Sequence, residues 1–396
     1  MSVTYDTLER GPQAPNAAST AQGLLPPLGS PDCWDDDDRT VLVCSAVSDV
    51  THDVKNFVFE PQADRTFQFE AGQFLTLLLE IDGRPVNRCY TVSSPPTRPH
   101  RIAITVKRVI GGPVSNWLHD TVEPGTTIAA MAPLGAFTLA RQPSGKYLFL
   151  SAGSGITPLM SMTRTLYDLG SDADVVFVHS ARTPADIVFR NELSAIESVM
   201  PNFRVVHVCE NDYPSERWGG MRGRLSPDML RTLVPDLHER VTFNCGPVPY
   251  MESVRRILAD LDYDTRSYHE ESFTFDDPAE PGGAPPPEGV EYDEIAISPP
   301  APETDDNSVA TYAVEFVKSG RTISCRADEN VLDATLAAGL RLPSSCTQGM
   351  CGTCKVSKLA GEVEMSHNGG IRPREIAASK ILICCSKPLS DLTIDG

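Results

Sequence analysis

The chain has 396 residues, of which 41% are hydrophobic and 22% charged, and it carries a formal net charge of −19 at pH 7. This length predicts two or three domains. The acidic excess argues against nucleic acid as a partner, because nucleic acids are bound through Lys and Arg. No apolar run approaches the length of a membrane span, and no basic segment precedes an apolar stretch at the N-terminus. Neither a transmembrane helix nor a signal peptide is therefore predicted.

The chain contains eleven cysteines. Without a secretory signal, so many thiols indicate a reducing compartment in which they serve metal binding or redox chemistry. A cytoplasmic protein is expected.

The N-terminal part of the chain divides into a tail and a β-rich region. Residues 1–38 are rich in Pro, Gly, Ala and Asp, lack apolar periodicity and carry a net charge of −6, which predicts a disordered tail. Residues 39–140 show short alternating runs such as TVLVCSAV, QFLTLLLEI and RIAITVKRV, separated by Gly, Pro and Asp. Many short strands in about 100 residues predict an antiparallel β-barrel.

One polar motif lies on a predicted strand of this barrel. NRCYTVSS places Arg88 and Tyr90 on one face of the strand and Thr91 and Ser93 on the other. Such a strand can offer a cation to a phosphate, an aromatic ring for stacking and a hydroxyl to a flavin nitrogen. Polar strand residues are also common without any ligand.

A second motif, GGPVSNWLHD, follows in the same region. Gly112 and Ser115 stand where a loop enters a helix that Ser115 and Asn116 are predicted to open, an arrangement suited to binding an anion. An ordinary N-capped helix is the alternative.

Residues 141–275 alternate strand and helix patterns, which predicts a doubly wound parallel sheet. In LSAGSGITPLM, a glycine-containing turn joins a strand to a helix, so backbone amides and the helix dipole can hold a pyrophosphate. In FNCGPVPYM, Cys245, Gly246 and Pro247 end the fourth strand; a buried core thiol is the alternative interpretation of Cys245. The pyrophosphate turn consists of Gly153, Ser154, Gly155 and Thr157.

Residues 276–307 contain eight prolines, ten acids and no basic residue, which predicts a flexible linker. Residues 308–396 form the last compact unit, with two strands, the helix NVLDATLAAG and then a cysteine-rich loop.

That loop and the strand after it contain C-x4-C-x2-C followed, 29 residues later, by a fourth Cys. This is the plant-type spacing for a [2Fe–2S] cluster, and it fits the paired ligands of a zinc site poorly. The expected ligands are Cys346, Cys351, Cys354 and Cys384; the adjacent Cys385 is either a core thiol or a competing ligand.

Together, the flavin and nicotinamide motifs resemble those of the ferredoxin–NADP reductase superfamily, fused here to a C-terminal plant-type ferredoxin of the α+β β-grasp fold. The resemblance implies a six-stranded flavin barrel in which Arg88 binds the pyrophosphate, Tyr90 stacks on the isoalloxazine and Thr91 lies near N5. Gly112 and Ser115 then form the phosphate cradle of FAD. Cys245 lies beside the nicotinamide, and Glu271 and Phe273 of YHEESF lie near the flavin.

The domain order resembles the reductase components of Rieske-type oxygenases that demethylate glycine betaine or stachydrine. The resemblance implies electron transfer from NADH to FAD, then to [2Fe–2S], and finally to a partner oxygenase. Reduction of hybrid-cluster protein or another acceptor is one alternative, and a non-enzymatic redox sensor using Cys384 and Cys385 is another. Ser180 and Arg182 can meet a 2′-phosphate, so NADPH is the alternative to the expected NADH. Arg182 is equally explained as a solvated loop residue.

Overall fold

The computed structural model describes residues 33–34, 40–62, 65–272 and 309–395, apart from 341, 343, 345, 346, 348, 350, 351, 353, 368 and 369. The predicted tail and linker lie almost wholly outside the described residues. Most of the barrel and the nucleotide-binding domain belong to one compact unit, and the C-terminal domain belongs to another.

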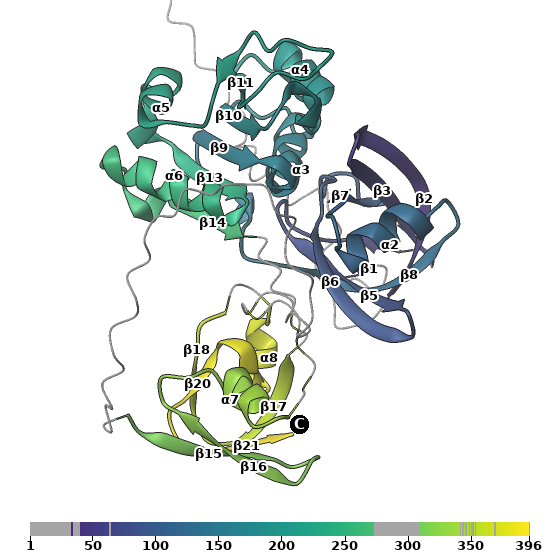
Figure 1. Cartoon of the computed structure of the whole chain (residues 1–396), viewed down its shortest axis with the longest axis vertical. Coiled ribbons are helices and arrows are strands. Elements are labelled where there is room, and N and C mark those ends of the chain that lie inside the picture. Colours follow the sequence, from purple (N-terminus) through teal and green to yellow (C-terminus); the bar gives the residue numbers. More distant parts are fainter. Residues whose placement is uncertain are drawn as a thin grey trace, which may run out of the picture. The chain divides into compact units, whose positions relative to one another are not determined.

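The first domain is an antiparallel six-stranded sheet in the order β6-β5-β8-β2-β3-β7 (Figure 1). Alternating burial along β2 places Leu42 and Cys44 in the core, as a strand with one solvated face requires. Beyond β6, Val92 bridges to Ile104 of β7, which brings the end of the flavin motif onto the far edge strand. The strands are β2 (Thr40–Thr51), β3 (Val54–Pro61), β5 (Phe74–Ile81), β6 (Arg84–Thr91), β7 (Ile102–Lys107) and β8 (Thr127–Leu134), with helix α2 (Pro113–Thr121) between the last two. The short strands β1 (Cys33–Trp34) and β4 (Thr66–Phe67) pair with each other.

The second domain is a parallel sheet in the order β12-β11-β10-β9-β13-β14. Helices α3 and α4 cover one face and α5 and α6 the other (Figure 1), which is the predicted doubly wound arrangement. The chain order reverses between the neighbouring strands β9 and β13, where such folds bind their ligands. The strands are β9 (Lys146–Ala152), β10 (Asp174–Ala181), β11 (Phe203–Cys209), β12 (Met221–Arg222), β13 (Val241–Gly246) and β14 (Tyr268–Ser272); the helices are α3 (Ile156–Asp168), α4 (Arg190–Val199), α5 (Pro227–Leu233) and α6 (Val248–Asp260).

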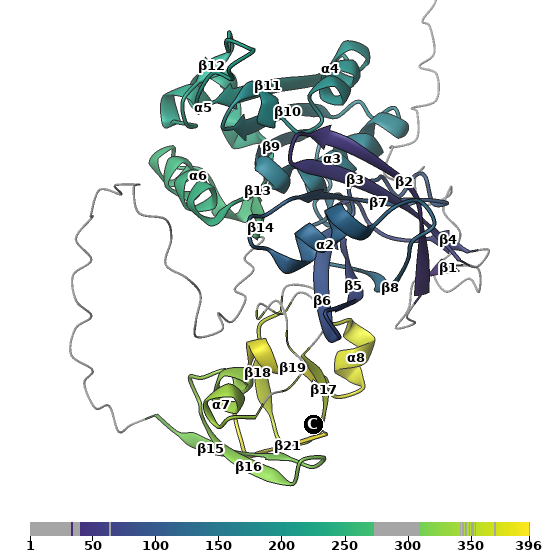
Figure 2. The same cartoon turned by 45° about the vertical axis from the view of Figure 1, so that its right-hand side comes forward.

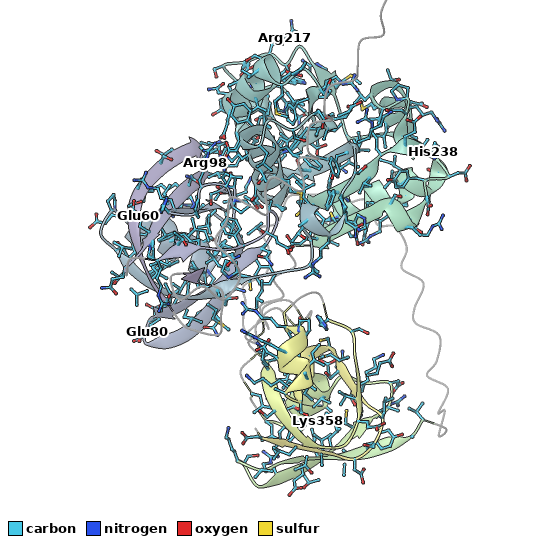
Figure 3. All side chains as sticks on the ribbon, turned by 180° about the vertical axis from the view of Figure 1, so that it is seen from behind. Glu60, Glu80, Arg98, Arg217, His238 and Lys358 are labelled. Atoms are coloured by element: carbon cyan, nitrogen blue, oxygen red, sulfur yellow. The ribbon has the colours of Figure 1, made fainter. Side chains whose placement is uncertain are left out.

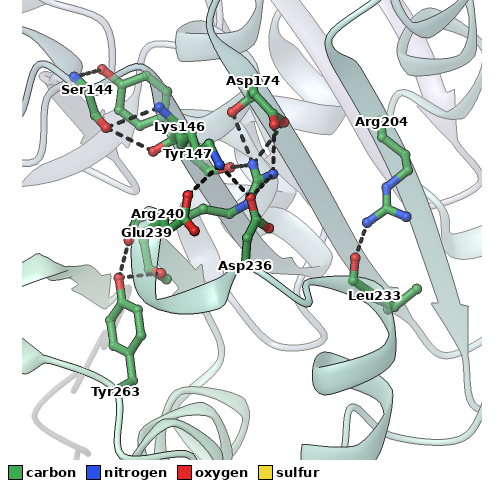
Figure 4. Close-up of polar contacts among 11 residues, drawn as sticks. Ser144, Lys146, Tyr147, Asp174, Arg204, Leu233, Asp236, Glu239, Arg240 and Tyr263 are labelled. Atoms are coloured by element: carbon green, nitrogen blue, oxygen red, sulfur yellow. Dashed lines mark hydrogen bonds and ion pairs between the residues drawn. The ribbon is translucent and has the colours of Figure 1, made fainter.

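An ionic network around the buried Arg240 joins the amino ends of the central strands of this sheet (Figure 4). The Arg240 side chain is 5% exposed and donates to both carboxylate oxygens of Asp174 and of Asp236 at 2.8–2.9 Å. The Lys146 ammonium also lies 3.0 Å from Asp236. These bonds hold the pKa of Asp236 down to about 2 despite its partial burial.

The C-terminal domain has a mixed five-stranded sheet in the order β16-β15-β21-β17-β19 and a separate pair, β18 with β20 (Figure 2). The predicted helix is present as α7, beginning after Asn330, and its Val331 and Leu332 are fully buried. The elements are β15 (Thr311–Phe316), β16 (Arg321–Arg326), α7 (Val331–Ala337), β17 (Lys355–Ala360), β18 (Val363–Met365), α8 (Pro373–Ala377), β19 (Lys380–Leu382), β20 (Ser386–Pro388) and β21 (Leu392–Asp395). No helix in the described parts of the chain is long and apolar enough to cross a bilayer.

Candidate active site

The flavin motif occupies the end of β6 and the residues that follow it. Thr91 is 5% exposed, and its hydroxyl has no hydrogen-bond partner among the described residues. Ser93 is different, because its hydroxyl lies 2.8 Å from the Thr105 hydroxyl and 3.2 Å from the carbonyl of Ala103. The Ser93 side chain therefore ties the motif to β7, and the Thr91 hydroxyl is the one left available. Arg88 and Tyr90 lie on β6, where burial raises the pKa of Tyr90.

Glu271 lies on β14 directly beside Cys245 of β13. Burial raises the pKa of Glu271 to about 8, so this carboxyl is mainly protonated at neutral pH. The Thr91 hydroxyl opposes part of this rise, although neither it nor Glu271 Oε2 completes a hydrogen bond of normal geometry within the described structure. Burial, with a contribution from the negative charge of Glu271, also raises the pKa of the Cys245 thiol. Thr91, Cys245 and Glu271 thus belong to one buried polar environment; Phe273 lies outside the described residues.

The predicted pyrophosphate turn is a single 3-10 turn, Gly153–Gly155, between β9 and α3. Gly153 has φ +53, and a Cβ on Gly155 would lie 2.3 Å from the carbonyl oxygen of Cys245. Only glycine permits this approach of the two loops at the switch point. Thr157 donates to the carbonyl of Ser154 at 3.1 Å, and no side chain caps the start of α3. The amides of its first turn are suited to a pyrophosphate, so these residues fit a dinucleotide.

The second predicted phosphate cradle is built around the start of α2. The helix begins at Pro113 with Gly112 as its N-cap, so the prediction that Ser115 and Asn116 open it was wrong by two residues. Pro is favoured at the first helical position, which explains the earlier start. The Ser115 hydroxyl accepts from the amide of Val109 at 3.1 Å and donates to the carbonyl of Gly112 at 3.3 Å. The Ser115 side chain therefore holds the turn in shape, and the part of the turn left to contact a phosphate is its backbone at Gly112.

Two of the four predicted cluster ligands lie within the described residues. Cys354 and Cys384 are 3% and 4% exposed. The amide of Gly349 donates to Cys384 Sγ at 3.2 Å, as an amide does to a cluster-ligating thiolate. Thr347, Gly349 and Gly352 have φ of +51, +67 and +70, so the loop uses the left-handed region at all three of these positions. This donor set fits a [2Fe–2S] cluster; Cys346 and Cys351 lie outside the described residues.

A buried ion pair beside this loop was missed by the sequence analysis. The ammonium of Lys355 contacts a carboxylate oxygen of Glu375, with side-chain exposures of 12% and 3%. A Cβ on Gly352 would lie 3.7 Å from Lys355 Nζ, so the positive charge lies against the cysteine loop. The only sequence clue is a Lys directly after the third Cys of the motif.

The residues expected to distinguish the two nicotinamide nucleotides follow β10. The Arg182 side chain is 65% exposed, and its guanidinium lies 3.5 Å from Asp186 and 4.0 Å from Asp53. Ser180 lies on β10 with its hydroxyl buried. A 2′-phosphate near Arg182 would therefore also meet two carboxylates.

Comparison with known families identifies three domains in the predicted order. A model of the oxidoreductase FAD-binding domain matches residues 42–139, and one of the oxidoreductase NAD-binding domain matches residues 149–256. A model of the 2Fe-2S iron-sulfur cluster binding domain matches residues 315–389. The chain therefore has the cofactor domains for FAD, NAD and a [2Fe–2S] cluster, as predicted.

Two relatives match nearly the whole chain. A glycine betaine monooxygenase reductase subunit of Pseudomonas aeruginosa is 45% identical over 358 residues, which are 90% of this chain and 95% of the relative. A stachydrine N-demethylase reductase subunit of Rhizobium meliloti is 41% identical over 91% of this chain and 97% of the relative. Among solved structures, phthalate dioxygenase reductase has the same fold, with a TM-score of 0.54 at 21% identity over 91% of this chain and 98% of that one.

Proposed function

Because this chain belongs to the family of FAD-, NAD- and [2Fe–2S]-binding reductase components of oxygenases, we propose that it serves a Rieske-type oxygenase that demethylates a betaine-like substrate. The names of the two relatives at 45% and 41% identity support this substrate class. When bound, FAD accepts hydride from NADH and passes electrons singly to the cluster.

The residues of this chain bind and orient these groups. Amides of Gly153–Gly155 and of the α3 N-terminus would hold the nucleotide pyrophosphate, and Cys245 would lie beside the nicotinamide. Thr91 would offer its hydroxyl to the flavin ring, and Glu271, protonated at neutral pH, would hold a proton near it. Arg88, Tyr90, Gly112 and Ser115 would hold the rest of FAD, and Cys346, Cys351, Cys354 and Cys384 would hold the cluster.

The structure of the switch point is the observation that carries this assignment. At the switch point of the parallel sheet, Gly155 meets the Cys245 carbonyl so closely that no side chain fits between them. In the same place Thr91 and Glu271 bury polar oxygens that have no partner in the described structure. Buried polar atoms are rarely left unbonded, so these atoms support a ligand at this point.

The test combines the purified holoprotein with the oxygenase subunit of a glycine betaine monooxygenase. The two proteins and the substrate are mixed without oxygen, and the mixture is then exposed to oxygen. Formaldehyde should be released from glycine betaine only when NADH, both proteins and oxygen are present. Cys351→Ser should abolish cytochrome c reduction and demethylation but retain ferricyanide reduction, which the flavin alone supports. Absence of NADH-dependent oxygenase reduction by the intact holoprotein would refute the proposed function.

We further propose NADH as the natural reductant, because Asp186 and Asp53 would repel the 2′-phosphate of NADPH from Arg182. Asp186→Asn should raise the ratio of kcat/KM for NADPH over NADH about fivefold, roughly 1 kcal/mol. An unchanged ratio in steady-state assays would remove this explanation of specificity.

A cytoplasmic location is also proposed. It is supported by the eleven cysteines of the chain, a content that suits metal binding and redox chemistry in a reducing compartment. Cell fractionation with the native chain should place it with cytoplasmic markers.

A further inference from the structure

Helix α3 connects the nucleotide-binding turn to the barrel. Its N-terminus follows Gly153–Gly155, and its first eight residues, 156–163, are buried on all sides. Such burial is expected of a helix enclosed between two layers, and Figures 1 and 2 both show α3 between the parallel sheet and the barrel. Ser161, Arg164 and Asp168 recur at spacings of three and four residues and so share one face of this helix.

All three side chains of this face bond to the segment that directly follows Thr91. The Ser161 hydroxyl donates to the carbonyl of Ser94 at 2.7 Å, and Arg164 Nη1 donates to the carbonyl of Ser93 at 2.5 Å. Asp168 accepts from the Arg98 guanidinium at 2.6 and 2.9 Å; Figure 3 labels Arg98 on the barrel. Helix α3 is therefore hydrogen-bonded to the end of the flavin motif and to the residues that follow it at three positions along the helix.

Arg164 is the central residue of these contacts. Its side chain is 12% exposed, and its Nε and Nη2 donate to the two carboxylate oxygens of Glu192, both at 2.7 Å. The guanidinium lies 4.6 Å from the ring centroid of Phe189, which has φ +58. A bulky residue is strained in the left-handed region and persists there only where its surroundings fix it. The guanidinium is thus oriented from several sides toward the Ser93 carbonyl.

The segment that follows Thr91 is also held by hydrogen bonds to the barrel. The amide of Ser93 donates to the carbonyl of Ala103 at 2.8 Å, and the Thr105 hydroxyl next to Ser93 Oγ donates to Asn56 at 2.9 Å. Neither side can shift alone, so the position of Thr91 is determined jointly by β7 and α3.

We propose that Arg164, assisted by Ser161, is a positioning residue that fixes Thr91 relative to the nicotinamide site at the N-terminus of the same helix. Arg164 lies seven positions after Thr157 in the helix, which is about 10 Å at the α-helical rise. One rigid element therefore sets the locations of both reactants. This inference rests on the proposed roles of Thr91 and of the Gly153–Thr157 turn.

The test compares flavin reduction by NADH in anaerobic stopped flow for the holoprotein and its variants. Arg164→Met should lower the limiting rate about tenfold, because small misplacements of reacting atoms cost large factors in rate. Its kinetic isotope effect with NADH deuterated at the transferred position should rise, and the visible circular dichroism of bound FAD should change. Arg164→Lys, which retains one charged donor, should restore part of the rate.

Arg190→Met is the matched control. Arg190 also makes a two-point pair with a glutamate, Glu216, at 2.8 and 2.9 Å and lies 5.5 Å from the Trp218 ring centroid, but both of these partners lie outside the flavin motif. It should change the limiting rate and the flavin dichroism little. Should Arg164→Met not fold, Ser161→Ala supplies the test, with an expected threefold fall in rate. If the wild type is reduced by NADH but these variants match the control in rate, isotope effect and dichroism, the inference is wrong. If the wild type itself fails to bind FAD or react with NADH, the proposed function fails first.

Discussion

The two ends of the parallel sheet treat buried polar groups in opposite ways. At the amino ends of the strands, Arg240 is bonded to two carboxylates and every one of its three guanidinium nitrogens has a partner. Near the carboxyl ends, Glu271 Oε2 of β14 and Thr91 Oγ1 of the barrel strand β6 are buried without hydrogen-bond partners in the described structure. An unpaired buried polar group costs about 1–3 kcal/mol. The amino ends of the strands thus stabilise the fold, whereas the carboxyl ends lose stability in order to bind cofactors.

Glu271→Gln should change the free energy of unfolding the most. Its carboxyl has a pKa raised to about 8, so between pH 4.5 and 8 the folded state retains a proton that the unfolded chain releases. Stability should therefore fall as pH rises through this window, by up to about 4 kcal/mol. Glu271→Gln should remove this slope in urea unfolding of the flavin-free protein at pH 5 and pH 9. Glu270→Gln, at the neighbouring position, should retain it; equal slopes in wild type and Glu271→Gln would contradict the prediction.

Arg240→Met tests the opposite end. Removing this 5%-exposed guanidinium leaves Asp174 and Asp236 without their main partner and should cost about 3 kcal/mol in free energy of unfolding at pH 7. The pKa of Asp236 is depressed to about 2 in the folded state. The stability that this carboxylate contributes is therefore present above its pKa in the unfolded chain and is lost as pH falls through about 2. The difference in stability between variant and wild type should accordingly become smaller in acid. NADH affinity should stay unchanged. A loss of affinity with little change in stability would reverse the roles assigned to the two ends.

Gly155→Ala sharpens the contrast within the site. The added Cβ would meet the Cys245 carbonyl at 2.3 Å and separate the two loops. NADH should bind about twentyfold more weakly, close to 2 kcal/mol, as measured by flavin reduction against NADH concentration. Gly145→Ala is the control, since nothing lies within 4 Å of its Cβ. Equal affinities for the two variants would show that the close approach is not needed.

Lys355 is an exception to this contrast, because it forms a buried ion pair with Glu375 and yet lies beside the cysteine loop. We expect Lys355→Gln to lower the cluster midpoint potential by about 50 mV, roughly 1 kcal/mol for one electron, since a positive charge favours the reduced cluster. Glu375→Gln should shift it in the opposite direction. Potentiometric titration followed by electron paramagnetic resonance measures both; two shifts of the same sign would exclude an electrostatic role.

The sequence predicted the architecture where information is local. Strand alternation, glycine turns and cysteine spacing are short-range patterns, and the barrel, the doubly wound sheet and the cluster domain follow in the expected order. Glu271 was recognised through family resemblance, and its raised pKa depends on burial that no local pattern reveals.

Contacts between distant residues could not be predicted. Arg164 and the Ser93 carbonyl are 71 residues apart, and Lys355 and Glu375 are 20 residues apart on separate elements. The two-residue strand β12 was also missed, because a segment this short has no periodicity. Nothing in the composition of α3 distinguishes Arg164 from an ordinary surface arginine.

Strand β12 has a further consequence for how the protein behaves in concentrated solution. The edge of a sheet exposes unpaired amide and carbonyl groups on which strands of other molecules can assemble. On this side, the last strand offers only Met221 and Arg222, the second of which carries a charge. β12 pairs only with Val208 and Cys209 of β11, and farther along β11 the amide of Val205 donates to a carboxylate oxygen of Glu197 at 2.8 Å. Part of this edge is thus already bonded within the chain, which lowers its tendency to pair with a strand of a second molecule.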